Sequence, residues 1–337
     1  MTKEHVPLSS LTTLRVGGRA QVVATCTSVE EVHAALAYAR EHNLPFYVLG
    51  EGSNVLAHDT GYAGLIIRIE IPGLSFEEEN GSVKVHAGAG VSWDELVEAA
   101  AKRGLWGLEN LAGIPGLVGA APVQNIGAYG AELKDTLESV EVIDAKTGEE
   151  KRLTSDECKL SYRDSTFKHD ASLIITGVTL MLQKEGTPRI EYGDLLRAKE
   201  AGVDLSTPLA IGAAVRQIRS GKFPDRTRFG TAGSFFKNPI LTQEAYDALC
   251  AKYGPIPQFP NPKGVKIPLA FILDKVLGLR GHRKGAAWLF GAQPLVLVLD
   301  EGGTASDVDS LAREIETRVK EETGISIERE VRSMPQK

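Results

Sequence analysis

The sequence has few residues of the kinds that bind metals or form covalent cross-links. Its three cysteines lie far apart without a C-x-x-C pair, and its seven histidines show no ligand spacing. This pattern excludes a disulfide framework, and we expect no bound metal. Reduced, unpaired thiols are typical of a cytoplasmic protein, which is the location we expect.

Long apolar runs and an excess of basic residues are also absent. No stretch approaches the roughly 18 apolar residues of a membrane span, and the first ten residues lack the apolar core of a signal peptide. We therefore expect neither export nor membrane insertion. A net charge of −6 leaves no general positive charge for nucleic acid, so a polyanion could bind only in a local basic pocket.

The 337 residues, 42% of them hydrophobic, suffice for two or three domains with separate cores. Short strands and helices in irregular order predict an α+β fold. Strands are expected at 21–25, 46–49, 137–143, 172–182, 295–299 and 325–332, with a hairpin around Asn80-Gly81. Helices are expected at 29–42, 93–104, 208–221, 242–253 and 268–277, followed by a long amphipathic helix that Ser306 caps and Gly324 ends.

The most unusual stretch is residues 111–130, LAGIPGLVGAAPVQNIGAYG, which carries no charge. Its five glycines are too many for a helix, and its β-branched residues are too few for an ordinary strand. Exposed main-chain N–H groups in such a stretch indicate a surface wrapped around a phosphate or a flat ring. Close packing of backbone on backbone in a core explains the composition as well, and both interpretations stay open.

A second glycine-containing turn, residues 50–56, directly follows the short strand expected at 46–49. Strand ends of α/β units are frequent ligand sites. The spacing differs from the dinucleotide pattern G-x-G-x-x-G, because position 55 is valine and no helix pattern follows. A Rossmann-type site is therefore excluded.

Three polar segments could carry chemistry: Tyr162–Ser165, Gly233–Pro239 and the end of the chain around Glu330. Each also has a simpler explanation. Arg163 could pair with a neighbouring carboxylate, Ser234 could cap a turn, and Glu330 could be one charge of a solvated run. Ser234 lacks the G-x-S-x-G setting of a triad serine, so a hydrolase of that type is not indicated.

Taken together, the segments resemble the UDP-N-acetylenolpyruvoylglucosamine reductases of bacterial cell-wall precursor synthesis. Matching stretches run in order across nearly the whole chain, and the one around Tyr192 is similar to the subgroup that closes a tyrosine loop over the substrate. They are residues 13–18, 50–56, 107–111, 114–116, 124–130, 162–165, 191–194, 233–239 and 330–332.

The resemblance implies a two-part FAD-binding domain of the vanillyl-alcohol-oxidase (PCMH) type plus a smaller α/β substrate domain. We expect the first domain at 1–222, with lobes at about 1–70 and 71–222 and a C-terminal tail that packs back on it, and the second at 223–337. The residues implied to hold a non-covalent FAD are Gly50, Glu51, Gly52, Ser53, Asn54, Val55, Ile114, Pro115, Gly116, Gly119, Ala120, Ile126, Gly127 and Arg219.

The implied reaction transfers hydride from NADPH to the flavin and then to the enolpyruvyl ether of UDP-N-acetylglucosamine. By resemblance, Arg163 and Glu330 polarise the substrate carboxylate and Ser234 gives the proton. Lys237 is a candidate neighbour that stabilises the serine alkoxide. The residues implied to bind the UDP-sugar are Tyr129, Tyr192, Lys222, Asn238 and Gln293. No obligate protein partner is implied.

The chain departs from common family spellings at Ala120-Ala121, where serines can occur, and at Arg329, where proline often precedes the glutamate. The second departure concerns how firmly Glu330 is aimed. Two other functions stay open: an FAD-dependent oxidase of an alcohol or sugar with the same fold, and a non-catalytic flavin- or nucleotide-binding regulator.

Overall fold

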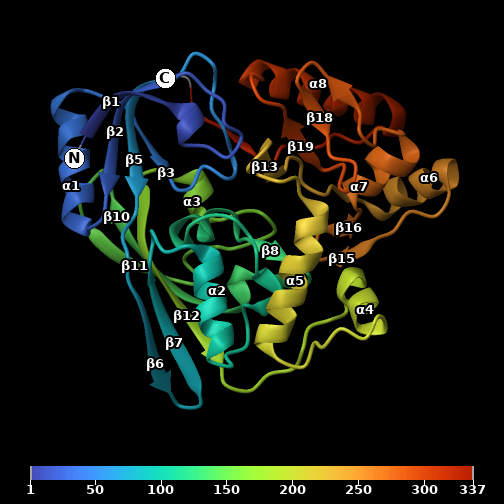
Figure 1. Ribbon diagram of the computed structural model, residues 1–337, viewed down its shortest axis with the longest axis horizontal. Coiled ribbons are helices and arrows are strands. Elements are labelled where there is room, and N and C mark those ends of the chain that lie inside the picture. The colour runs from blue at the N-terminus through green and yellow to red at the C-terminus, as the bar shows by residue number, and fades with distance from the viewer. Residues whose placement is uncertain (1, 336–337) are drawn as a thin grey trace.

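The computed structural model describes residues 2–335 and shows an α+β fold (Figure 1). Its first part is a four-stranded sheet ordered β1-β2-β5-β3, in which only β1 runs antiparallel to its neighbour. The strands are β1 (Thr2–Pro7), β2 (Arg19–Cys26), β3 (Phe46–Leu49) and β5 (Tyr62–Ile69). Helix α1 (Val29–Glu41) joins β2 to β3, and the Ser28 hydroxyl caps it by accepting the Glu31 N–H. The two strands and the helix expected here are confirmed.

The second part is a five-stranded antiparallel sheet ordered β11-β10-β12-β7-β6. Its strands are β6 (Leu74–Glu79), β7 (Ser82–Gly88), β10 (Leu137–Asp144), β11 (Glu150–Thr154) and β12 (Leu173–Gln183). The predicted hairpin is confirmed: Asn80 and Gly81 connect β6 to β7 with φ of 46° and 88°. Positive φ at both central residues is what a two-residue type I′ turn requires.

The uncharged stretch, together with the residues on either side of it, folds as a series of short 3₁₀ turns between the second sheet and two helices. The turns are Glu109–Leu111, Val118–Ala120 and Pro122–Gln124, followed by β8 (Gly127–Ala128) and β9 (Ala131–Glu132). Helices α2 (Trp93–Lys102) and α5 (Pro208–Lys222) pack against each other and against the first of these turns. The stretch is thus neither a regular helix nor an ordinary strand, as its composition predicts.

The C-terminal part begins after α5 and contains two small sheets and three helices. The sheet strands are β13 (Gly230–Ser234), β17 (Arg283–Lys284), β18 (Ala287–Leu289) and β19 (Val296–Leu299), and β14 (Ile240–Leu241), β15 (Phe259–Asn261) and β16 (Gly264–Lys266). The helices are α6 (Gln243–Tyr253), α7 (Leu269–Phe271) and α8 (Ala305–Thr323). Two short helices, α3 (Thr166–His169) and α4 (Gly193–Glu200), belong to the preceding part.

Three expectations for the C-terminal part are wrong in detail. Helix α8 begins after Thr304 instead of Ser306, because Thr304 and Asp307 form a reciprocal capping box while Ser306 donates to Asp59. The helix expected at 268–277 passes from α7 into a π-helical turn, Ile272–Val276. Residues 325–332 form no continuous strand, since only Arg329 makes a bridge before β20 begins.

The chain returns to its N-terminal part at the end. Strand β20 (Arg332–Ser333) pairs in parallel with β4 (Val55–Leu56), and the Met334 N–H donates to the Leu56 carbonyl. In Figure 1 the last described residues accordingly lie beside the first sheet and not beside α8. Within residues 2–335, no helix has the length and apolar content to span a bilayer.

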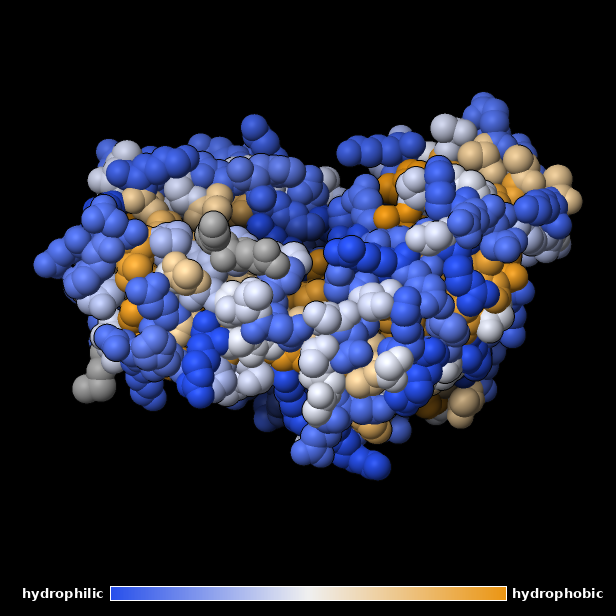
Figure 2. Space-filling view, turned by 90° about the horizontal axis from the view of Figure 1, so that it is seen from above, coloured by the Kyte–Doolittle hydropathy of each residue, from blue (hydrophilic) through white to orange (hydrophobic). Residues whose placement is uncertain are grey.

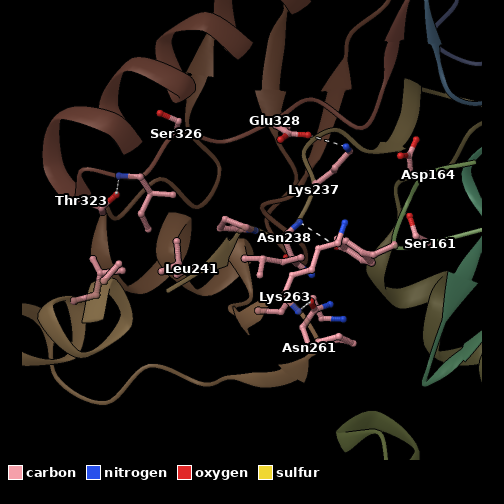
Figure 3. A pocket seen from close by; sticks show the side chains of 18 of the residues that line it. Ser161, Asp164, Lys237, Asn238, Leu241, Asn261, Lys263, Thr323, Ser326 and Glu328 are labelled. Atoms are coloured by element: carbon pink, nitrogen blue, oxygen red, sulfur yellow. Dashed lines mark hydrogen bonds and ion pairs between the residues drawn. The ribbon is translucent and has the colours of Figure 1, made fainter. Parts of the chain in front are cut away.

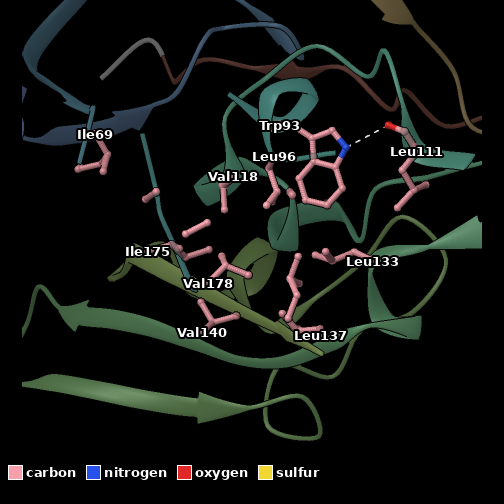
Figure 4. Packing of buried hydrophobic residues seen from close by; sticks show 14 of the residues in the cluster. Ile69, Trp93, Leu96, Leu111, Val118, Leu133, Leu137, Val140, Ile175 and Val178 are labelled. Carbon is pink, nitrogen blue, oxygen red and sulfur yellow. Dashed lines mark hydrogen bonds between the residues drawn. The ribbon is translucent and has the colours of Figure 1, made fainter. Parts of the chain in front are cut away.

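Trp93 belongs to the main hydrophobic core, together with Leu96, Val118 and Leu133 (Figure 4). Its indole N–H donates to the Leu111 carbonyl at 3.0 Å, which ties α2 to the start of the uncharged stretch. Both groups are buried, so this hydrogen bond leaves no polar atom of the pair unsatisfied.

We therefore predict that Trp93→Phe lowers the free energy of unfolding by about 1–3 kcal/mol, because the buried carbonyl loses its donor. Chemical or thermal unfolding followed by circular dichroism measures the change. Trp106→Phe is the control, since the described residues offer its indole N–H no acceptor and it is less buried. Equal effects of the two substitutions would contradict the role given to this hydrogen bond.

Candidate active site

A cavity of about 1460 Å³ opens between the first sheet, the uncharged stretch and the C-terminal part. Figure 2 shows the surface hollowed between the two halves of the molecule. The cavity exceeds the roughly 300–1,000 Å³ of common small-molecule sites, so it has room for a dinucleotide cofactor. All residues that the sequence assigns to FAD line it, from Gly50 to Val55, from Ile114 to Gly127, and Arg219.

The glycines of residues 50–56 and 111–130 differ in the space around them. Gly52 has φ of +70°, and an added Cβ would meet the Leu11 carbonyl oxygen at 2.3 Å, so this glycine is required for backbone packing. A Cβ added at Gly119 would meet the Ala89 Cβ at 2.6 Å, whereas one added at Gly50 would meet nothing closer than Ala120 at 3.6 Å. Backbone packing therefore explains Gly52 and Gly119, while binding of a phosphate or a flat ring by these segments stays a prediction.

Arg219 is the clearest sign of a ligand in the cavity. Its Nε donates to the Gly113 carbonyl at 2.9 Å, and no carboxylate lies within ion-pair distance among the described residues. Burial lowers the pKa of Arg219, because the charged guanidinium is removed from water. Arg216, one turn earlier on α5, pairs with Asp94 instead. A half-buried cation without a countercharge fits the diphosphate of FAD.

Arg163 sits at the tip of a tight turn and points its side chain into the cavity. Its φ of 53° is rare for a residue with a side chain, and such strain is characteristic of functional sites. The guanidinium donates to the Gly127 carbonyl at 2.7 Å, and its Nε lies 2.9 Å from Glu330 Oε1. Burial acts to lower the pKa of Arg163, but the combined attraction of Glu330, Tyr162 and Glu132 outweighs it and the net shift is upward.

Ser234 and Glu330 come from different ends of the C-terminal part, and a hydrogen bond at Phe235 brings their segments together. The register of β13 shifts between Thr231 and Ser234, where Gly233 has φ of +75°, and Ser234 lies on the cavity wall as the last residue of the strand. The next residue, Phe235, accepts the N–H of Glu330 through its carbonyl at 2.8 Å. Arg163, Ser234 and Glu330 thus line the same cavity although they lie far apart in the sequence.

Three of the five residues expected to bind the substrate, Tyr129, Tyr192 and Lys222, lie in a separate group. Tyr192 packs edge-on against Tyr129, with ring centroids 5.3 Å apart, and stacks on Phe259 at 6.3 Å. Burial raises the pKa of Tyr129 to about 12, so this phenol stays neutral at physiological pH. The ammonium of Lys222 forms an ion pair with Asp194, the second residue of α4. Tyr192 precedes α4, so this pair fixes the tyrosine segment to the end of α5.

Asn238 and Lys237 line a second cleft, which Figure 3 shows from close by. The ammonium of Lys237 pairs with Glu328 at 2.7 Å, and Lys237 does not line the cavity that holds Ser234. The idea that Lys237 stabilises the serine alkoxide is therefore not supported. Asn238 is fixed from two sides, since its N–H donates to Tyr162 Oη and its Oδ1 accepts the Leu269 N–H.

Gln293 lines neither cavity and belongs to a turn, where its N–H donates to the Phe290 carbonyl. Three contributors were missed by sequence reasoning. Asp194 is the counter-ion of Lys222, Gln124 accepts a hydrogen bond from Asn54 Nδ2 at 2.8 Å, and Asp94 accepts the N–H of Gly113. Asp194 and Gln124 lie within stretches that carry the family resemblance, and this resemblance could have indicated them as site residues. Residues 2–335 contain no cluster of ligands for a metal ion.

Comparison with known proteins defines the class. A family model described as FAD binding domain matches residues 20–154, which include β2, β3 and β5 of the first sheet and both glycine-containing segments of the cavity wall. Together with the fold, this match defines an FAD-dependent oxidoreductase with a two-part FAD-binding domain of the vanillyl-alcohol-oxidase type and a smaller α/β domain.

Three further comparisons define the family. The model described as UDP-N-acetylenolpyruvoylglucosamine reductase, C-terminal domain, matches residues 225–334. Proteins of that name from Chromobacterium violaceum and Pseudoalteromonas atlantica are 39% and 38% identical, covering 97% of this chain and 97% and 94% of theirs. The crystal structure of the Thermus caldophilus reductase matches with a TM-score of 0.70 at 29% identity, over 99% of this chain and 100% of that one. The chain belongs to the UDP-N-acetylenolpyruvoylglucosamine reductase family.

Arg219→Met tests the fit of the cavity to FAD. We predict roughly tenfold weaker FAD binding or more, because a charge-assisted contact worth about 1.5 kcal/mol or more is lost. Titration of the apoprotein with FAD, followed by flavin fluorescence, gives the dissociation constant. Arg103→Met, at the exposed end of α2, is the control and should bind FAD normally. Unchanged affinity of the Arg219 variant would show that this guanidinium does not contact the cofactor.

Proposed function

We propose that this enzyme reduces the enolpyruvyl ether of UDP-N-acetylglucosamine to UDP-N-acetylmuramate, with NADPH as the reductant. The observation that carries the proposal is the meeting of Arg163, Ser234 and Glu330 at one cavity with both cofactor segments. The names of the relatives support the same reaction. FAD, when bound, supplies the hydride that reduces the double bond.

The chain's own residues handle charge and proton. Addition of hydride to the methylene carbon leaves negative charge on the neighbouring carbon and in the substrate carboxylate. The Arg163 guanidinium stabilises this charge, while Glu330 keeps the guanidinium in place through the contact at Nε. The Ser234 hydroxyl holds the proton that the neighbouring carbon receives. One hydride and one proton together balance the reduction.

The UDP-sugar is held by the group around Tyr192 in this proposal. Lys222 supplies a positive charge for the diphosphate, and Tyr129 and Tyr192 supply ring surface. Asn238 contributes from beside Tyr162. Gln293 has the least structural support, since it lines neither cavity.

We also propose a division into an FAD-binding domain, 1–222, and a substrate domain, 223–337, with the enzyme acting in the cytoplasm. Support for the division comes from a separate hydrophobic cluster built mainly from residues 232–331. The three free cysteines agree with a reducing location.

Anaerobic titration tests the function directly. NADPH should bleach the yellow enzyme, and the enolpyruvyl UDP-sugar should then restore the colour. An oxidase of the same fold behaves in the opposite way, because its substrate reduces the flavin. A binding protein without catalysis shows neither change. Failure of the enolpyruvyl UDP-sugar to reoxidise the flavin would refute the proposed reaction.

Ser234→Ala isolates the proton donor. We predict unchanged reduction by NADPH and a loss on the order of a hundredfold or more in reoxidation by substrate, because only that half-reaction needs the proton. Stopped-flow absorbance of the flavin measures both rates. Ser333→Ala, whose hydroxyl contacts His58 near the chain end, serves as the control. Equal damage to both half-reactions would indicate that Ser234 positions the cofactor.

A further inference from the structure

We propose that Arg329 is a positioning residue, which aims Glu330 and the Ser234 segment at the cavity by anchoring both to helix α8. The inference rests on the proposed function and extends it beyond the residues that line the cavity. Arg329 itself is not among those residues.

The side chain of Arg329 is held by two carboxylates on α8. Its Nε and Nη2 donate to the two oxygens of Glu316, at 2.6 and 3.1 Å, and its Nη1 donates to Asp309 Oδ1 at 2.6 Å. The two bonds to Glu316 form a bidentate pair, which fixes direction as well as distance. About a quarter of the Arg329 side chain is exposed, so solvent screens these contacts only in part.

The main chain around Arg329 pairs with the segment that follows Ser234. Arg329 forms a bridge with Phe236, flanked by a bond from the Lys237 N–H to the Glu328 carbonyl at 2.9 Å and one from the Glu330 N–H to the Phe235 carbonyl at 2.8 Å. The guanidinium carbon also lies 5.8 Å from the centre of the Phe235 ring. Arg329 therefore contacts the residue after Ser234 and precedes Glu330.

Helix α8 is a suitable base for this anchor. Its 19 residues are capped at Thr304, and its inner face, including Leu311 and Ile315, is fully buried in the C-terminal core. The carboxylates of Asp309 and Glu316 therefore project from a rigid element. Because these two carboxylates neutralise Arg329 locally, its effect on the cavity is one of geometry and not of charge.

The experiment compares Arg329→Gln with Arg313→Gln in the FAD-loaded enzyme. Arg313 is the matched control, since it forms an ion pair with the same Asp309 at 2.8 Å. Unlike Arg329, it lies on helix α8 itself and its side chain is largely exposed, so its pair with Asp309 does not connect residues 328–330 to the helix. Both variants are followed through the two anaerobic half-reactions. Glu316→Gln and the double variant Glu316→Gln/Arg329→Gln complete a cycle, and Arg329→Lys tests rescue by a residue that keeps the charge without the fork.

We expect Arg329→Gln to reoxidise with the enolpyruvyl UDP-sugar about tenfold more slowly at saturating substrate, with normal FAD content and normal reduction by NADPH. The double variant should be no slower than Arg329→Gln alone, Arg329→Lys should be intermediate, and Arg313→Gln should match the parent. Lower stability with unchanged reoxidation, or equal slowing of both half-reactions, would overturn the inference.

If Arg329→Gln unfolds, Glu316→Gln carries the test, because it removes the bidentate pair and leaves the arginine in place. Its reoxidation must then be slower than that of Arg313→Gln, and equal rates overturn the inference. Failure of the parent enzyme to reoxidise with the UDP-sugar refutes the proposed function. A normal parent with a normal Arg329→Gln variant refutes only the positioning role.

Discussion

A junction of three hydrogen bonds holds the candidate active site together. The Phe235 carbonyl accepts the N–H of Glu330, the Glu330 carbonyl accepts Asn54 Nδ2 at 3.2 Å, and the Asn54 carbonyl accepts the N–H of Arg332 at 3.0 Å. Segments from the beginning, the middle and the end of the chain are thereby joined. Because Ser234 and Glu330 use only main-chain groups of their segments for this purpose, their side chains remain available to the cavity. Residues 50–56 and Ser234 are therefore held in a fixed position relative to each other.

The two arginines of the cavity, Arg163 and Arg219, differ in how their positive charge is compensated. Arg163 has its own countercharge in Glu330, so the pair is nearly neutral before a carboxylate arrives. Arg219 is half-buried and has no carboxylate partner among residues 2–335, so binding of an anion would offset part of its desolvation cost. A ligand that binds the folded state in this way also stabilises it. A protein of net charge −6 can thus hold polyanions, because the positive charge is local and half-buried.

Local signals explain which parts of the fold could be predicted. The Asn80-Gly81 hairpin and the start of helix α1 depend on residues next to each other in sequence, and both were predicted correctly. Residues 50–55 line the cavity, and their place was predictable because glycines directly after a strand are frequent in ligand sites. Where neighbouring residues offered similar chemistry, prediction failed: Thr304 and Ser306 are both good caps, and Asp59, 247 residues before Ser306, decides between them. The alternating pattern of 325–332 likewise gave no information on which chain segments lie beside it.

The least predictable features are those in which one side chain positions another. The pairing of Asp194 with Lys222 depends on two helices that meet only in the fold. Arg329 is a second example, because the sequence does not show that its side chain pairs with carboxylates on α8. At this position, before the glutamate, proline is common in the family that the chain resembles. Phe236 and Arg329 lie between the two hydrogen bonds that flank them, so neither residue donates its N–H across the bridge. Proline, which lacks an N–H and has a restricted φ, is compatible with this position and stiffens it locally. Arginine lacks that stiffness, so here the rigidity before Glu330 must come from its carboxylate partners on α8.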